Sequence, residues 1–186
     1  MAAHHLIVGG QRSGKSRHAE ALALAHARGR AAPCVTVVAT ALDADAEMAA
    51  RIARHRADRP ADFATLEAPL ALTEALQAAA APGHLLLVDC LTLWLTNWLM
   101  PMDGAPDLAG WAREREALLA ALPRLVSPVL FVSNEVGWGV SPLGREARFY
   151  VDELGRLNQA VAARCTTLTL MVAGQPWSRP VDAATP

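Results

Sequence analysis

The chain has almost no net charge and almost no lysine. Its 186 residues include seventeen basic and eighteen acidic residues, which gives a formal net charge of −1. A protein whose main partner is a polyanion usually carries a clear excess of positive charge on one face. The charge balance therefore argues against nucleic acid as the main partner, and the length is that of one domain, over residues 1–186, with a full core.

Cysteine is scarce, and long hydrophobic runs are absent. The three cysteines, Cys34, Cys90 and Cys165, lie far apart and form no C-x-x-C pair. We expect all three to be small buried side chains in a reducing compartment. The most apolar stretch, residues 85–100, is too short and too polar to span a bilayer. No signal peptide is recognisable, because the chain enters its first predicted strand at once. We therefore expect a soluble cytoplasmic protein.

The sequence does contain a phosphate-binding pattern near its start. Residues 9–16 follow G-x-x-x-x-G-K-S, the pattern of a P-loop, although an ordinary glycine-rich turn is the alternative. The preceding residues 4–8 predict a short buried strand, and the Ala/Leu-rich residues 17–28 predict a helix. The free backbone N–H groups and the positive end of the helix dipole at the start of this helix would then bind an anion. The expected phosphate contacts are Gly9, Gly10, Gln11, Arg12, Ser13, Gly14, Lys15 and Ser16.

The only lysine of the chain is Lys15, inside this pattern, and the other sixteen basic residues are arginines. A lysine ammonium is a compact charge on a thin stem that fits between β- and γ-phosphates, whereas the broad guanidinium fork does not. We therefore expect Lys15 to act on the phosphates.

Apolar strands alternate with helical patterns along the rest of the chain. This alternation predicts an α/β fold of the P-loop NTPase class, with a mostly parallel sheet and helices on both faces. We expect the tail from Pro176 to be loose. The further predicted strands are residues 34–39, 63–66, 85–88, 129–132 and 168–172, and the further predicted helices are 43–56, 70–81, 91–99, 108–122 and 145–164.

Polar residues follow several of these strands, at the edge where ligands gather in such sheets. Asp89 comes after four apolar residues, which is a Walker-B position, and it could hold Mg²⁺ together with the hydroxyl of Ser16. The alternative for Asp89 is an N-cap of the helix that begins at Leu91. Glu67 and Glu135 are loop carboxylates that could be caps, surface charges or functional groups. Glu67 could accept two hydrogen bonds from guanine.

His55 lies among four arginines within residues 51–60. One interpretation is a solvated basic helix end. The other is a nucleophilic imidazole in a triphosphate-binding patch, because neighbouring cations disfavour its protonated form. Attack on an α-phosphate would form a phosphoramidate and expel pyrophosphate.

Four blocks of sequence resemble the bifunctional adenosylcobinamide kinase / adenosylcobinamide-phosphate guanylyltransferase family. They are GGQRSGKSR at 9–17, EMAARIARHRADRP at 47–60, DCLTLWLTN at 89–97 and SNEVGWG at 133–139. The resemblance implies phosphorylation of adenosylcobinamide by ATP or GTP, and then transfer of GMP from GTP. It also implies a RecA-like fold, a homotrimer and His55 as the residue that carries GMP. The nucleotide contacts implied beyond the P-loop are Ala39, Thr40, Ala41, Arg56, Ala57, Asp58, Arg59, Glu67 and Asp89.

Two other functions stay open at this point. The protein could be a single-function P-loop kinase for a small molecule, with His55 in a structural role. It could also be a binding module in which GTP orders a surface for a protein partner. A covalent histidine adduct distinguishes both from the bifunctional enzyme.

Overall fold

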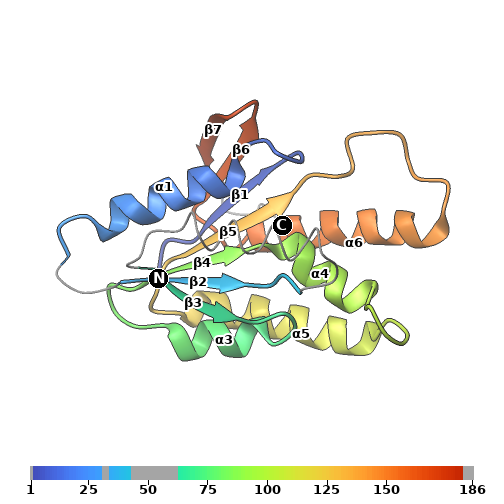
Figure 1. The fold of residues 1–186 in the computed structure, drawn as a ribbon, viewed down its shortest axis with the longest axis horizontal. Coiled ribbons are helices and arrows are strands. Elements are labelled where there is room, and N and C mark those ends of the chain that lie inside the picture. Colours follow the sequence, from blue (N-terminus) through green and yellow to red (C-terminus); the bar gives the residue numbers. More distant parts are fainter. Residues whose placement is uncertain (1, 31–33, 43–62, 182–186) are drawn as a thin grey trace.

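The structure is a computed structural model that describes residues 2–30, 34–42 and 63–181. These residues form one seven-stranded sheet with the strand order β3-β2-β4-β5-β1-β6-β7. Six strands are parallel, and β7 runs antiparallel to β6 (Figure 1). The strands are β1 (His5–Gly9), β2 (Val35–Ala39), β3 (Ala64–Glu67), β4 (Leu85–Asp89), β5 (Val129–Asn134), β6 (Thr167–Val172) and β7 (Gln175–Pro180).

Helices cover both faces of this sheet, as the alternation of strands and helices predicts. Residues Ala19 and Ala23 of α1 pack against one face, and α3, α4, α5 and α6 contribute to the core on the other. The helices are α1 (Lys15–Ala27), α3 (Leu72–Ala79), α4 (Leu91–Leu99), α5 (Leu108–Ala121) and α6 (Arg145–Ala162), with a 3₁₀ turn at Leu122–Arg124. The predicted helix over 43–56 lies outside the described residues. Within the described part of the chain, no helix combines the length and apolar character needed to cross a membrane.

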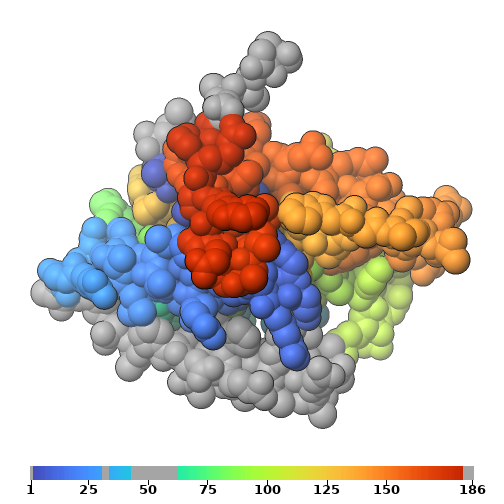
Figure 2. Space-filling model, turned by 90° about the horizontal axis from the view of Figure 1, so that it is seen from above, coloured from blue at the N-terminus to red at the C-terminus, as the bar shows by residue number. Residues whose placement is uncertain are grey.

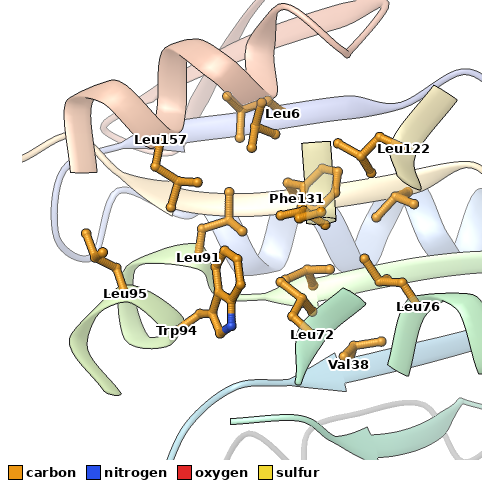
Figure 3. Close-up of a cluster of buried hydrophobic side chains, with 14 of the residues drawn as sticks. Leu6, Val38, Leu72, Leu76, Leu91, Trp94, Leu95, Leu122, Phe131 and Leu157 are labelled. Carbon is orange, nitrogen blue, oxygen red and sulfur yellow. The ribbon is translucent and has the colours of Figure 1, made fainter. Parts of the chain in front are cut away.

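Strand side chains alternate between the two cores. Leu6 of β1 faces the core under α4 and α6, whereas its neighbour Ile7 faces the core under α1. The first core is shown in Figure 3, where Trp94 and Phe131 lie among leucines from several helices and strands. Strands buried on both faces lack the apolar/polar alternation of half-exposed strands, which is why their sequences read as short continuous apolar runs.

The expectation of a loose tail from Pro176 is wrong. Residues 175–180 form β7, which pairs with β6 around a two-residue turn at Ala173 and Gly174. Both turn residues have positive φ, +49° and +80°, the combination that a type I′ hairpin turn needs. The sequence signal is weak because alanine, unlike asparagine or aspartate, is uncommon at positive φ.

The cysteines follow the expected pattern with one exception. Cys34 and Cys165 are buried, whereas Cys90 is only half-buried at the junction of β4 and α4. Burial raises the pKa of the Cys165 thiol to about 12. Burial and the charge of Asp89 raise the pKa of Cys90 to about 11. Neither thiol is therefore ionised near neutral pH, which makes both poor nucleophiles.

Candidate functional site

The loop of residues 10–14 connects β1 to α1 at the carboxyl edge of the sheet. Gly9 and Gly14 have positive φ, +154° and +97°, and Gly14 is the N-cap of α1. A Cβ on Gly9 would lie 2.5 Å from the backbone oxygen of Met171. The two glycines are therefore needed both for the path of the backbone and for space, as a loop that wraps phosphates requires.

Lys15 is the first residue of α1 and is buried. Its Nζ donates to the carbonyl oxygen of Gly10 at 2.6 Å and to Oγ of Ser13 at 3.4 Å. The ammonium is thus held over the same loop whose backbone amides would cradle the phosphates. Ser16 follows in the first turn of the helix and is half-buried.

The hairpin of β6 and β7 supports this loop from the side. The backbone N–H of Gly174 donates to the carbonyl oxygen of Ser13 at 3.0 Å. A Cβ on Gly14 would lie 3.3 Å from Cα of Gly174. Figure 2 shows the hairpin in red beside α1 and the blue N-terminal part of the chain. Because the sequence signal for β7 is weak, this contact to the phosphate loop could not be predicted.

Asp89 ends β4, and β5 lies between β4 and β1. Two strand spacings of about 4.8 Å place the end of β4 roughly 10 Å from the end of β1. The N-cap of α4 is Cys90 and it makes no side-chain cap hydrogen bond, so the interpretation of Asp89 as that N-cap is wrong. The Walker-B role of Asp89 stays a prediction.

The residues available for Mg²⁺ are the hydroxyl of Ser16 and the carboxylate of Asp89. Both offer hard oxygen ligands, which Mg²⁺ prefers. The described residues contain no group of three or more His, Cys, Asp or Glu side chains that could hold a metal ion. One hydroxyl and one carboxylate would suit Mg²⁺, which takes few protein ligands and keeps phosphates and water in its shell.

A buried threonine connects the ends of β2 and β4. Thr40 is fully buried, and its Oγ1 accepts from the backbone N–H of Cys90 at 2.9 Å and donates to the Cys90 carbonyl oxygen at 2.7 Å. Asn97 of α4 donates to the carbonyl oxygens of Thr40 and Pro69, at 2.7 and 2.9 Å. One helix thus holds together the segments that follow β2, β3 and β4.

The first turn of α4 also contacts β5 and α6. The hydroxyl of Thr92 accepts from the backbone N–H of Asn134 at 2.8 Å. The carbonyl oxygen of Thr92 accepts from the hydroxyl of Tyr150 at 3.0 Å. Trp94 of the same helix is buried in the core, and the polar residues of this helix join the strand ends.

Glu135 follows β5 directly and is half-buried. Its backbone N–H donates to the carbonyl oxygen of Gly9 at 3.1 Å. Its Oε1 accepts from Nδ2 of Asn158 at 3.2 Å, and the same Nδ2 donates to the Asn134 carbonyl oxygen at 3.0 Å. Glu135 is therefore joined to the last residue of the strand that enters the phosphate loop.

The predicted site residues fall into two groups along the sheet edge. Glu135 and the phosphate loop lie at adjacent strands, with Asp89 one strand further on. Ala39 pairs with both Glu67 and Asp89, so Ala39, Thr40, Ala41 and Glu67 gather on the other side of Asp89. The end of β3 is four strand spacings from β1, roughly 19 Å. His55 and the nearby Arg56, Ala57, Asp58 and Arg59 lie outside the described residues.

A cavity of ≈ 460 Å³ opens beside α4 and α6. Tyr150, which lines it, is the residue that hydrogen bonds to Thr92, and Thr92 in turn bonds to Asn134. Tyr150, in the wall of the cavity, is therefore connected through Thr92 to Asn134, the residue before Glu135. The lining includes Leu99, Met100, Leu108, Glu146, Phe149 and Tyr150.

A loop with the pattern G-x-x-x-x-G-K-S between a buried strand and a helix, at the carboxyl edge of a mostly parallel sheet, defines a P-loop nucleotide-binding protein. Within that class, the chain belongs to the family described as cobinamide kinase / cobinamide phosphate guanyltransferase, which matches residues 5–178.

Two curated relatives are similar over nearly their whole length. The bifunctional adenosylcobalamin biosynthesis protein CobP of Pseudomonas aeruginosa is 53% identical over 171 residues, which cover 92% of this chain and 94% of that protein. The bifunctional adenosylcobalamin biosynthesis protein CobU of Salmonella typhimurium is 41% identical over 178 residues, covering 91% and 95%.

Solved structures with some similarity include two bacteriophage P4 proteins. The protein of phage phi13 has a TM-score of 0.44 at 15% identity, and that of phage phi6, in complex with ADP, has 0.44 at 17% identity. The alignments cover 94% and 98% of this chain but 53% and 58% of the phage proteins, so the chain spans a little over half of their length.

Proposed function

We propose that this protein phosphorylates adenosylcobinamide with ATP or GTP and then transfers GMP from GTP to the product, giving adenosylcobinamide-GDP. The observation that carries the proposal is a phosphate loop with the right local geometry in a chain that belongs to this family over residues 5–178. Full-length similarity to two proteins named as bifunctional supports both activities in one chain.

In the kinase half, the backbone of residues 9–16 binds the phosphates and Lys15 neutralises charge on them. Ser16 and Asp89 would hold Mg²⁺, which when bound supplies further charge neutralisation on the phosphates. Catalysis of phosphoryl transfer is mostly positioning and electrostatic stabilisation. Lys15 suits this task because it is buried at the start of α1 and its Nζ is already hydrogen bonded to the loop.

In the guanylyltransferase half, the nucleophile is the imidazole of His55. A nitrogen–phosphorus bond forms at the α-phosphate of GTP while the bond to pyrophosphate breaks. A phosphate oxygen of adenosylcobinamide phosphate then attacks the same phosphorus and releases the imidazole. Guanine would be bound by Glu67, and the nucleotide by the backbone of Ala39, Thr40 and Ala41 with residues 56–59 and Asp89. Because the Thr40 hydroxyl is already bonded on both sides to Cys90, we expect its backbone to make the contact.

Covalent labelling tests the second half. Incubation with α-labelled GTP and Mg²⁺, followed by denaturation, should leave label on the protein that is labile in acid and stable in alkali. His55→Ala should abolish the label, whereas the control His26→Ala, on α1, should keep it. Absence of label on the wild-type protein at every GTP concentration would contradict the guanylyltransferase and leave the single-function kinase. A binding module that responds to GTP would give neither label nor phosphoryl transfer.

The kinase half is tested separately with γ-labelled ATP and adenosylcobinamide. Lys15→Ala should lower phosphoryl transfer by about a hundredfold or more, the usual cost of removing a main electrostatic contact. Activity that survives this change would contradict the assignment of the phosphate loop.

We further propose that the protein works in the cytoplasm as a homotrimer formed by one domain of residues 1–186. Sedimentation analysis of the purified protein tests the oligomeric state, since a monomer of 19.7 kDa and a trimer are well separated.

A further inference from the structure

We propose that Glu135 is the general base of the kinase reaction, whose carboxylate accepts the proton of the acceptor hydroxyl. This inference rests on the proposed function. In this step the hydroxyl oxygen forms a bond to the γ-phosphorus, and the bond from that phosphorus to the leaving nucleoside diphosphate breaks. The hydroxyl proton passes to the Glu135 carboxylate and then to solvent, so atoms and charge balance.

Glu135 lies beside the strand that enters the phosphate loop. Gly9 and Asn134 are register partners at the ends of β1 and β5, and the N–H of Glu135 donates to the Gly9 carbonyl oxygen. Glu135 therefore leaves the sheet one strand spacing, about 4.8 Å, from the point where the phosphate loop begins. A general base has to lie within hydrogen-bond reach of the reacting hydroxyl, and the γ-phosphate end of a nucleotide on this loop brings the hydroxyl to this edge.

The side chain of Glu135 is held by a residue of α6. Asn158 is buried on α6 and donates from a single Nδ2 to the Glu135 carboxylate and to the Asn134 carbonyl oxygen. This contact orients one oxygen of the carboxylate and leaves Oε2 for the hydroxyl. Among the described residues, Oδ1 of Asn158 has no hydrogen-bond partner, so within that part of the chain this buried amide forms its hydrogen bonds at Nδ2 alone. Asn158 is thus a positioning residue for Glu135.

The other acidic residues that follow the strands are less well placed. Asp89 lies two strand spacings from β1 and is needed for the metal ion. Glu67 lies four spacings away at the opposite edge of the parallel strands, roughly 19 Å from the phosphate loop. Among the described strand ends, Glu135 is the carboxylate next to the loop.

A cavity beside α4 and α6 offers space for part of an acceptor. The cavity between α4 and α6 is lined by Tyr150, which is connected through Thr92 to Asn134. Its apolar lining suits the hydrocarbon parts of a large acceptor.

The test is Glu135→Gln, assayed for both reactions of the same preparation. Glutamine keeps an oxygen that can accept from Asn158, so the fold and the contact to α6 are preserved while the proton acceptor is lost. We expect kcat of adenosylcobinamide phosphorylation to fall about a hundredfold or more, with the nucleotide KM unchanged. Labelling by α-labelled GTP should stay within about twofold of wild type, because that reaction does not use the acceptor hydroxyl. Glu135→Asp should recover part of kcat.

The matched control is Glu116→Gln, which removes the same charge from the exposed surface of α5 and should leave both reactions unchanged. A kcat for Glu135→Gln within about threefold of an active wild type would overturn this inference and leave the proposed function standing. So would a folded variant that loses both reactions, since Glu135 would then serve the nucleotide. A wild-type protein that does not phosphorylate adenosylcobinamide would refute the proposed function itself, and this inference with it.

Discussion

Thr40 and Cys90 are joined by two hydrogen bonds that use one hydroxyl group. Oγ1 of Thr40 accepts from the Cys90 N–H and donates to the Cys90 carbonyl oxygen, at 2.9 and 2.7 Å. The hydroxyl thereby satisfies both backbone groups of the residue that follows Asp89, inside a region where Thr40 is fully buried. The position of Asp89, the proposed Walker-B carboxylate, thus depends on the side chain of the residue that follows the neighbouring strand β2.

Replacing this hydroxyl should destabilise the protein and misplace Asp89. Thr40→Val keeps the shape but removes the hydrogen-bond partner of the Cys90 N–H, which costs about 1–3 kcal/mol of unfolding free energy. The Cys90 carbonyl oxygen keeps the Trp94 N–H as a donor at 3.1 Å. Phosphoryl transfer should also fall by about tenfold to a hundredfold. Thr40→Ser is the matched control, because it keeps the hydroxyl. Urea unfolding and kinase assays measure both effects, and equal behaviour of the two variants would contradict the role of the hydroxyl.

The two glycines that open the phosphate loop should respond differently to alanine. A Cβ on Gly9 would lie 2.5 Å from a backbone oxygen and 2.8 Å from Oγ of Ser13, whereas a Cβ on Gly10 would meet no atom of the described residues within 4 Å. Gly9→Ala should therefore lower the unfolding free energy by about 1–3 kcal/mol, the usual cost of overpacking. Gly10→Ala should change it by less than about 0.5 kcal/mol. Similar thermal stability of the two variants in the absence of nucleotide would contradict this packing.

Amine-selective labelling should report on nucleotide at a single side chain. Lys15 is the only lysine, so an amine reagent has that residue and the chain terminus as its targets. Because Lys15 is buried and its Nζ is hydrogen bonded, we expect it to react more slowly than the terminus. Bound nucleotide should slow the reaction further. Peptide mass spectrometry measures both rates, with Lys15→Arg as a control that labels only the terminus. An unchanged Lys15 rate at saturating nucleotide would show that the phosphates bind elsewhere.

Stability should fall as the pH drops below neutrality. His4 is buried, its Nδ1 accepts from the Val129 N–H at 3.2 Å, and its Nε2 lies 2.8 Å from the carbonyl oxygen of Leu122. The ring is therefore neutral with its proton on Nε2. Burial lowers the pKa of His4 from 6.5, against a smaller opposite effect of the Leu122 carbonyl.

The direction of this change of stability with pH follows from the lowered pKa of His4. In the unfolded chain His4 binds a proton near pH 6.5, whereas in the folded chain it does so only at lower pH. The contribution of neutral His4 to stability is therefore complete above pH 6.5, and it is lost as the pH falls from 6.5 to the lower pKa of the folded chain. Burial also lowers the pKa values of His5, His18 and His84, which adds to the effect. Urea unfolding between pH 7 and pH 5 measures the slope. In His4→Gln the slope should be shallower, and an unchanged slope would contradict the prediction.

Local patterns predicted most of the elements correctly. The apolar runs became β1 to β6, and the predicted helices outside residues 43–62 are present with small changes at their ends. Glycine spacing and periodicity act over a few residues, so they can be read without knowing the fold. The failures have a different origin. β7 depends on a turn with Ala173 at positive φ, and the polar contacts of Asn97 and Thr92 join segments more than twenty residues apart.

The sequence by itself determined that a phosphate loop lies between a strand and a helix, since that motif is made of neighbouring residues and backbone amides. Only the tertiary structure decided which carboxylates lie beside it. The order of strands in a sheet is set by long-range packing, which the spacing of residues along the chain does not encode. Glu67, Asp89 and Glu135 each follow a predicted strand in the sequence. The sheet places Glu135 next to Gly9, Asp89 two strands from β1, and Glu67 four strands away.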